Sequence, residues 1–298
     1  MTTRQAIDGV LLLNKPVGWT SNGALQKAKW LLNAAKAGHT GTLDPFANGL
    51  LPICFGQATK FSSYALHGNK TYRATLKLGI TTTTGDTEGE ILDTRPVNVD
   101  EAQVLNVLPG FTGNIQQTPP MYSAIKHQGK PLYEYARQGI EIERKSRSVT
   151  IYRLAFTALQ GDELKLEVDC SGGTYIRTLA EDIGNKLGCG AHLTALERTA
   201  SNHFSLNNAI DLETLEKLEP QARLARLLPP DVMVAALPKI EIDTEAAQLL
   251  KQGKPLPTLD HTTLQPNEIA RVYCAGAFMG LVVLDDDQLR ASRLMATG

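Results

Sequence analysis

The pattern of apolar and polar side chains predicts an alternation of strands and helices over most of the chain. Continuous apolar runs indicate buried strands at 8–16 and 49–55, and strict alternation over 72–78 indicates a half-buried strand. Two more strands are expected at 148–157 and 163–170. Helices are expected at 22–33, 57–66, 100–108, 175–187, 211–219 and 222–228. This succession predicts an α/β protein.

Two of these helices carry signals for where they start and which face they bury. Ser21 is expected to cap the helix at 22–33, with Leu25, Trp30 and Leu31 on one apolar face. Thr174 is expected to cap the helix that follows two glycines, with Leu179, Ile183 and Leu187 at helical spacing. Both helices are therefore expected to pack against a sheet.

Prolines at 229–230 and 238 indicate a linker that separates a smaller carboxy-terminal unit. Beyond this linker the pattern predicts one helix at 244–252 and short strands that include 270–274 and 278–284. A unit of about 60 residues has little core of its own, so it is expected to pack against its neighbour.

The charge balance does not suggest a nucleic-acid partner, but the distribution of charge does. Thirty basic and 31 acidic residues give a net charge of -1 over 298 residues. Residues 1–60 hold six basic and two acidic side chains, and residues 121–153 hold seven and three, so each has a local charge of +4. Acidic residues gather late, at 285–287. A basic, RNA-facing side with an acidic back is consistent with this distribution.

Other features of the composition narrow the class of protein. The four cysteines have neither metal-ligand spacing nor a paired framework, so no disulfide and no metal site are expected. No apolar run reaches the ~18 residues of a membrane span. The first residues lack an apolar signal core, which predicts a cytoplasmic protein.

Residues 126–145 combine basic side chains with tyrosines, and two interpretations stay open. The segment could be a solvated amphipathic helix, which is a common role for a run of charges. It could equally bind RNA by phosphate contact and stacking.

The stretch at 38–45, Gly-His-Thr-Gly-Thr-Leu-Asp-Pro, predicts a rigid loop that presents His39 and Asp44 side by side. Its two glycines allow backbone conformations closed to other residues, and Pro45 biases Asp44 away from the helical region. In an arbitrary Asp-Pro pair the aspartate would most often cap a helix.

This stretch, with Gly-Leu-Leu-Pro shortly after it, resembles the catalytic motif of the TruB family of pseudouridine synthases. Those enzymes isomerise one uridine in the T loop of transfer RNA, at position 55. Gly-Thr-Tyr-Ile-Arg at 173–177 is a second family motif, and the resemblance runs in ordered motifs from Asp8 to Phe204. After Ile240 the chain is similar to the PUA-like domain of RNA-modifying enzymes.

The resemblance implies a fold and a division of the chain. Residues 1–236 would form a catalytic domain, with a mixed, mostly antiparallel sheet flanked by helices, and 237–298 a small β-rich PUA-like, RNA-binding domain. Residues 120–147 resemble the mobile segment that closes over the T loop. The implied partner is the T-arm stem-loop of tRNA, with no membrane, no obligate protein partner and a monomeric state.

The resemblance also implies the catalytic residues. Asp44 matches the family aspartate, which could attack carbon 1′ as a nucleophile or remove the 2′ hydrogen to give a glycal. Arg177 matches the arginine that pairs with it, and would keep the carboxylate ionised. Tyr72 matches the tyrosine that stacks on the target base and is placed to assist proton removal from carbon 5. A phenol with a pKa near ~10 is a poor base at neutral pH, which favours stacking.

The implied substrate-binding residues are Tyr72 and five others. They are His39, Tyr175, Leu196, Lys15 and Lys126. The isomerisation gains and loses no atoms and has no redox step, so no cofactor is expected.

Two alternatives stay open at this point. The chain could be a non-catalytic RNA-binding or RNA-remodelling protein. It could also be a related synthase that acts on ribosomal RNA within a guide ribonucleoprotein. An intact set of Asp44, Tyr72, Tyr175 and Arg177 speaks against the first alternative, because a binder needs no carboxylate facing phosphate.

Overall fold

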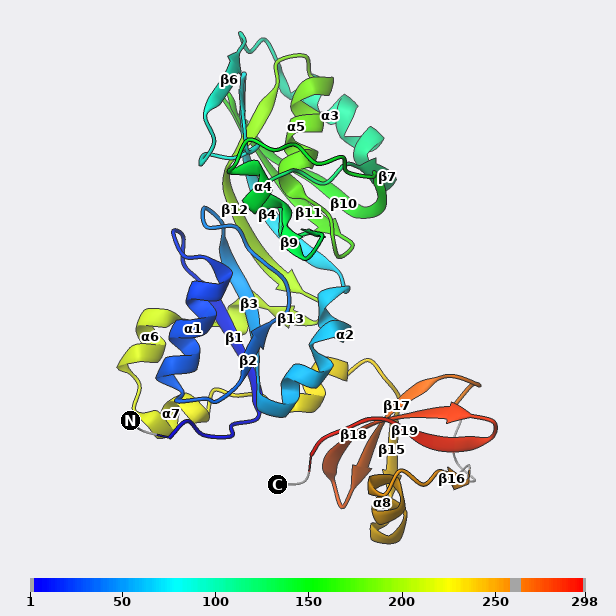
Figure 1. The fold of residues 1–298 in the computed structure, drawn as a ribbon. Coiled ribbons are helices and arrows are strands. Elements are labelled where there is room, and N and C mark those ends of the chain that lie inside the picture. The colour runs from blue at the N-terminus through cyan, green and yellow to red at the C-terminus, as the bar shows by residue number, and fades with distance from the viewer. Residues whose placement is uncertain (1–2, 258–263, 297–298) are drawn as a thin grey trace.

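The computed structural model describes residues 3–257 and 264–296 and contains one large and one smaller sheet (Figure 1). The large sheet has ten strands, and two of its strand pairs are parallel, β1 with β14 and β3 with β12. The other pairs are antiparallel, which confirms the mixed, mostly antiparallel sheet. Its path is β14 (Ile210–Asp211), β1 (Gly9–Lys15), β3 (Asn48–Phe55), β12 (Ala191–Ser201), β4 (Lys70–Leu78), β11 (Glu163–Cys170), β10 (Arg147–Gln160) and β7 (Gly113–Gln117), with β2 (Ala37–His39) beside β3 and β13 (Phe204–Ser205) beside β12.

Helices cover the large sheet in two groups (Figure 1). One group packs near β1 and β3 and the other near β4 and β11. The first group is α1 (Ser21–Leu31), α6 (Leu212–Lys217) and α7 (Pro220–Leu224); the second is α3 (Glu101–Val107), η2 (Leu108–Phe111) and α5 (Ile176–Lys186). A small hairpin of β5 (Ile80–Thr82) and β6 (Ile91–Thr94) precedes α3. No helix in the described ranges is long and apolar enough to cross a membrane.

The start of α1 differs from the prediction. Thr20, rather than Ser21, is the N-cap, since its hydroxyl accepts a hydrogen bond from the Gly23 amide at 2.9 Å. Ser21 is buried and bonds to the loop that carries Asp44. Trp30, predicted on the apolar face, is 66% exposed, because the buried face of α1 is made by smaller side chains.

The predictions for two other helices also need correction. The helix expected at 57–66 is a 3-10 helix, η1 (Gly56–Phe61), followed by one short α-helix, α2 (Ser62–Leu66). Thr174 does not cap α5, since its hydroxyl donates back to the Ser171 carbonyl in the preceding turn and the N-cap is Tyr175. The pattern also missed the long strand β12.

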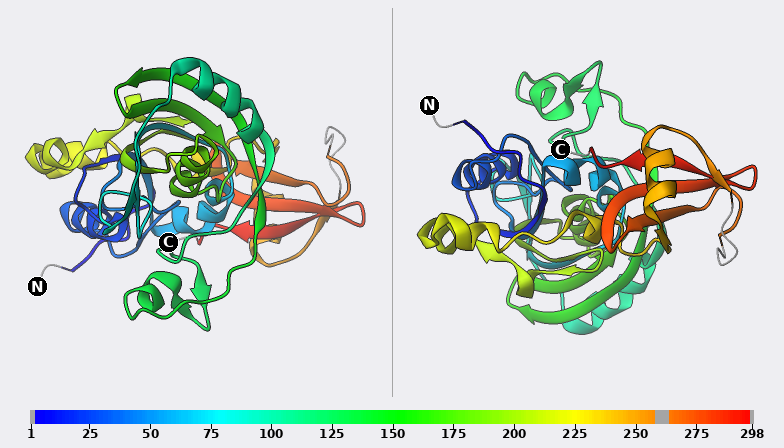
Figure 2. Two further views of the ribbon diagram at one scale, coloured as in Figure 1. Left: turned by 90° about the horizontal axis from the view of Figure 1, so that it is seen from above. Right: turned by 90° about the horizontal axis from the view of Figure 1, so that it is seen from below.

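The basic segment near 126–145 is not one amphipathic helix. It forms a two-stranded hairpin of β8 (Lys126–His127) and β9 (Lys130–Pro131), followed by the short helix α4 (Leu132–Ala136). Both views of Figure 2 show this green segment standing out from the body of the molecule.

The smaller sheet has five strands and packs against the beginning of the large one. Phe61 of η1 and Phe278 have ring centroids 5.3 Å apart, and Arg293 donates to the Lys60 carbonyl at 2.6 Å. Its strands are β15 (Lys239–Ile242), β17 (Ile269–Cys274), β18 (Ala277–Asp285), β19 (Gln288–Leu294) and β16 (Leu256–Pro257), with α8 (Thr244–Lys251) beside them and η3 (Leu206–Asn208) and η4 (Pro230–Val234) before them.

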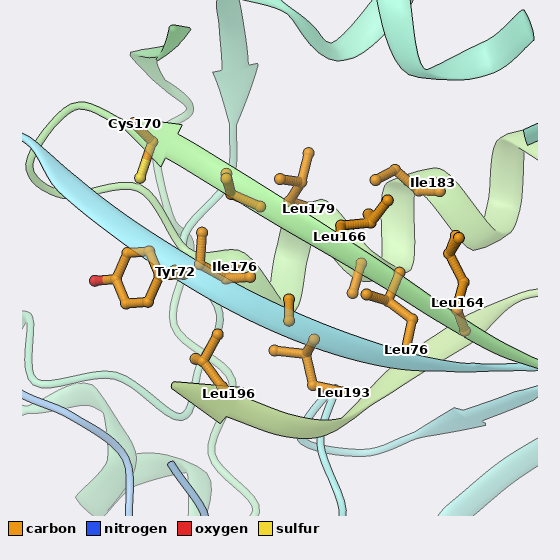
Figure 3. Packing of buried hydrophobic residues seen from close by; sticks show 14 of the residues in the cluster. Tyr72, Leu76, Leu164, Leu166, Cys170, Ile176, Leu179, Ile183, Leu193 and Leu196 are labelled. Carbon is orange, nitrogen blue, oxygen red and sulfur yellow. The ribbon is translucent and has the colours of Figure 1, made fainter. Parts of the chain in front are cut away.

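The main core lies between α5 and strands β4, β11 and β12, and Tyr72 lies at its edge. Figure 3 shows Leu76, Leu164 and Leu166 packed together, with the Tyr72 hydroxyl pointing away from them. Fully burying a leucine contributes about 1.5–3 kcal/mol, so this cluster holds α5 firmly against the sheet. Residues at the ends of these elements are thereby fixed relative to one another.

Candidate active site

A cavity of about 480 Å³ opens where the Asp44 loop, β4, β12 and the start of α5 meet. This volume is within the ~300–1,000 Å³ that small-molecule sites usually occupy. Five of the predicted site residues line it: Asp44, Tyr72, Tyr175, Arg177 and Leu196. They come from four separate parts of the chain, which the fold brings together.

The loop that carries Asp44 is fixed by hydrogen bonds from the beginning of α1. The Ser21 hydroxyl donates to the Leu43 carbonyl at 2.8 Å and accepts from the Leu43 amide at 2.7 Å. The Gly18 amide donates to the Pro45 carbonyl at 2.8 Å. No helix follows Asp44, so its carboxylate is not used as a cap and is 34% exposed toward the cavity.

Arg177 holds that carboxylate from the first turn of α5. Its side chain is 4% exposed, and Nε lies 3.0 Å from Asp44 Oδ2. The other nitrogens donate to the carbonyls of Thr84 at 2.9 Å and Tyr122 at 2.6 Å. With the guanidinium plane fixed by these bonds, Arg177 aims the Asp44 carboxylate.

Asp86 is a second carboxylate on Arg177 that the sequence interpretation missed. It is 2% exposed, and Oδ2 lies 3.4 Å from the same guanidinium. Its Oδ1 accepts from the Thr84 hydroxyl at 2.6 Å and from the Glu88 amide at 3.0 Å. The sequence of residues 81–90 predicted only a polar turn. The one feature that could have pointed to Asp86 was a carboxylate among threonines.

Three charges and burial set the proton affinity of Asp44. Burial raises the pKa of the Asp44 carboxyl above its ordinary value, and the negative charge of Asp86 adds to the rise. The Arg177 guanidinium opposes the rise by its charge and its hydrogen bond, and Lys15 opposes it by its charge. Arg177 is thus the main group that favours the ionised form of Asp44.

Tyr72 and Leu196 supply an apolar surface in the cavity. They are 8% and 6% exposed, and they lie on the adjacent strands β4 and β12. Burial raises the pKa of the Tyr72 phenol, and the charge of Arg198 opposes that rise. A phenol with a raised pKa is a still weaker base at neutral pH, so the ring is better suited to stacking on a base.

Tyr175 lies directly before α5, in extended conformation, while Arg177 is already helical. An extended stretch is expected if both side chains line the site, and only Tyr175 is extended; both line the cavity because the helix starts between them, at Ile176. The Arg147 guanidinium lies 4.9 Å from the Tyr175 ring centroid and donates to the Gly173 carbonyl. Arg147 also lines a second hollow with Lys126, Arg144 and others, so it connects the cavity to the basic segment.

The remaining predicted residues lie outside the cavity wall. His39 is half-buried at the end of β2, and burial together with the charge of Arg198 lowers its pKa. Lys15 is buried, donates to the Pro16 and Trp19 carbonyls, and has its pKa lowered by burial to about 8. Lys126 is exposed on β8 and lines the second hollow.

Comparison with family models matches residues 29–235 and 238–295 to three related descriptions. Residues 29–176 match "TruB family pseudouridylate synthase (N terminal domain)". Residues 177–235 match "tRNA pseudouridylate synthase B C-terminal domain", and residues 238–295 match "Pseudouridine synthase II TruB, C-terminal".

Two similar proteins share one name and align over nearly their full length. A protein named tRNA pseudouridine synthase B from Thiobacillus denitrificans is 57% identical over 295 residues, covering 99% of this chain and 98% of that one. One of the same name from Aromatoleum aromaticum is 51% identical over 295 residues, covering 99% and 94%.

Solved structures with the same fold come from larger assemblies. A chain of a Cbf5-Nop10-Gar1 complex superimposes with a TM-score of 0.72 at 25% identity, covering 97% of this chain and 84% of that one. A chain of an H/ACA RNP bound to a substrate RNA containing 2'-deoxyuridine has a TM-score of 0.73 at 23% identity, covering 97% and 85%. The second likeness concerns the fold alone.

Proposed function

This chain belongs to the TruB family of pseudouridine synthases, and from that premise we propose that it isomerises the uridine at position 55, in the T loop of tRNA, to pseudouridine. Relatives at 51–57% identity over nearly the full chain bear the name tRNA pseudouridine synthase B. The reaction breaks the N-glycosidic bond, turns the uracil and rejoins it through carbon 5, so every atom of the substrate is kept.

The observation that carries the proposal is the pair of Asp44 and Arg177 at the cavity wall, 3.0 Å apart. In this assignment Asp44 is the catalytic carboxylate at the ribose. It acts on carbon 1′ as a nucleophile or takes the 2′ hydrogen to give a glycal. Arg177 keeps it charged and oriented in either route.

The uracil would lie against the apolar wall of the cavity. Tyr72 would stack on the base and Leu196 would pack against it, while Tyr175 would contact the nucleotide. A base inside a folded T loop can reach this cavity only if it is flipped out of its stack, at a cost of roughly a few kcal/mol.

The other assignments concern contacts around the cavity. His39 would contact the everted nucleotide and Lys126 would contact the T arm. Lys15, predicted to bind substrate, would act on Asp44 through its charge. The segment 120–147 would close over the RNA and gain order on binding. Residues 1–236 form the catalytic domain in this proposal, and 237–298 a PUA-like RNA-binding domain. The enzyme would act as a monomer, in the cytoplasm, without an obligate protein partner.

A release assay on an isolated T-arm hairpin tests this function. Transcripts with tritium at carbon 5 of uridine should lose label to the purified protein, because carbon 5 exchanges its hydrogen for the new glycosidic bond. Mapping of the product should place the modification at the uridine equivalent to position 55.

The two alternatives give different results in the same assay. A non-catalytic RNA-binding protein would retain the hairpin and release no tritium. A synthase that depends on a guide ribonucleoprotein would leave the isolated hairpin unmodified and act on ribosomal RNA only with its partners. Either result would contradict the proposal.

A further inference from the structure

Arg198 is a buried arginine at the centre of the site, and among the described residues its charge has no carboxylate partner. It is 1% exposed, on β12, and lines the cavity. Nε donates to the Leu50 carbonyl at 2.7 Å, and the other two nitrogens donate to the carbonyls of Gly41 at 3.2 Å and Thr42 at 3.4 Å. Within residues 3–257 and 264–296, Asp44 and Asp86 pair with Arg177, and no acidic group lies within 4.0 Å of Arg198.

Strand register places Arg198 between the two groups that the reaction is expected to need. It is directly opposite Tyr72 on β4 and directly opposite Gly49 on β3. The three carbonyls that it holds lie on either side of Asp44, two just before it and one at the start of β3. Arg198 therefore connects the backbone around Asp44 to the strand pair that carries Tyr72.

Gly49 makes this close approach feasible. Its φ is +106°, and an added Cβ would lie 2.5 Å from the carbonyl oxygen and 2.7 Å from the amide nitrogen of Arg198. Both atoms are backbone and cannot move aside without displacing β12. A glycine at this position is what lets β12 lie close enough for Arg198 to span the loop and the strand.

The free-energy cost of burying its charge indicates that Arg198 does more than fill space. Burying a cation costs several kcal/mol, and an apolar side chain of similar volume would often hold strands together equally well. The planar guanidinium differs from such a side chain, because it presents several donors in a rigid fork. Here the fork fixes three carbonyls of one loop and one strand at once. Its charge also opposes the rise that burial causes in the pKa of Tyr72.

We propose that Arg198 is a positioning residue of the active site, which fixes the Asp44 loop relative to Tyr72 by bridging Gly41, Thr42 and Leu50. This inference rests on the proposed function, since it assigns Asp44 and Tyr72 to one reaction. It predicts that Arg198 acts on the chemical step rather than on RNA affinity, because its bonds go to the backbone.

Two variants distinguish the hydrogen-bonding geometry of the Arg198 guanidinium from its positive charge. Arg198→Lys keeps the charge but cannot bond three carbonyls in a plane, and Arg198→Met removes the charge. In both we expect the single-turnover rate on the T-arm hairpin to fall by about 10²-fold, the size of effect that a displacement of about 1 Å can have. The dissociation constant for the hairpin should stay within about threefold of the wild-type value.

Arg223→Met is the matched control. Arg223 also donates to three backbone carbonyls, those of Leu215, Leu31 and Glu216, but it lies outside the cavity. The control variant should lose thermal stability and keep the wild-type rate when assayed well below its melting temperature.

Amide hydrogen exchange tests whether Arg198 fixes the Asp44 loop, without relying on turnover. In Arg198→Lys, amides of residues 40–48 should exchange faster than in the wild-type protein, while those of β11 should not change. Wild-type rates in a folded Lys or Met variant, or unchanged protection of 40–48, would overturn the positioning role. Wild-type turnover on the hairpin is measured in parallel, so that failure of the proposed function itself is recognised separately.

Discussion

At the scale of single residues, one arginine separates two carboxylates of different exposure. Asp44 faces the cavity, whereas Asp86 is buried and paired with the same Arg177. The exposed acid can meet a substrate and the buried acid cannot, so the two have different roles. Asp86 holds the guanidinium in place and, by its own charge, raises the pKa of Asp44.

This arrangement predicts a shifted pH profile for Asp86→Asn. In the proposed reaction Asp44 acts in its ionised form, so activity should be lost as the pH falls through the pKa of that carboxyl. Removing the charge of Asp86 removes one cause that raises this pKa, so the acid limb should move to lower pH. The maximal rate should also fall, because Arg177 is held less firmly.

Single-turnover rates measured against pH check this prediction. Glu90→Gln is the control, since it removes an exposed carboxylate from the same turn. An acid limb that stays in place or moves to higher pH in Asp86→Asn would contradict the assignment of Asp86.

The residues that the sequence predicted are those that belong to contiguous motifs. Asp44 and Arg177 were found in this way, and the structure brings them to 3.0 Å. Asp86 belongs to no such string, and Arg198, although it lies two residues after Leu196, was not singled out. Their importance comes from contacts with residues far away in the chain, and pattern alone does not show which polar side chains a fold will bury.

At the scale of elements, the Asp44 loop and β12 depend on each other. The loop is held by Ser21 on one side and by Arg198 on the other. The approach of β12 to β3 depends on the absence of a side chain at Gly49, whose added Cβ would lie 2.5 Å from the Arg198 carbonyl oxygen.

Gly49→Ala should therefore be strongly destabilising. The positive φ and the backbone clash together predict a loss of about 2–4 kcal/mol in the free energy of unfolding. Gly161→Ala is the matched control, because Gly161 also has a positive φ (+61°) but nothing within 4 Å of the added Cβ, and it should cost about 1–2 kcal/mol. Urea denaturation of both variants measures the difference, and equal losses would contradict the close approach.

Elements with a regular period were predictable and irregular ones were not. β4 alternates strictly along its length, and α3 has a capping box between Asp100 and Gln103. β12 was missed because a register shift between Leu193 and Ala195 interrupts its alternation. Part of the alternation remains after that shift. Leu196 and Arg198 are two residues apart on the same strand and both are buried, which is the spacing expected of a strand face.

At the scale of the whole molecule, Arg147 links the cavity to the projecting basic segment. It lines both hollows, and its Nε is buried without a hydrogen-bond partner among the described residues. A cation in this position is suited to an RNA phosphate.

Arg147→Gln should weaken binding of the T-arm hairpin and reduce the slope of log K against log salt by about 1. Arg153→Gln is the control on the same strand, because Arg153 is exposed and already paired with Glu167 and Asp169. Filter binding at several salt concentrations measures both slopes. Equal slopes in the two variants would contradict a phosphate contact at Arg147.

The central claim concerns the Asp44 carboxylate, and Asp44→Asn tests it most directly. The asparagine has nearly the same shape and cannot act as nucleophile or base, so tritium release from the bound T-arm hairpin in a single turnover should fall to background. The variant should fold and bind the hairpin with near wild-type affinity, while Asp169→Asn, a change on β11 outside the cavity, should release label at the wild-type rate. Measurable tritium release by purified Asp44→Asn would contradict the account.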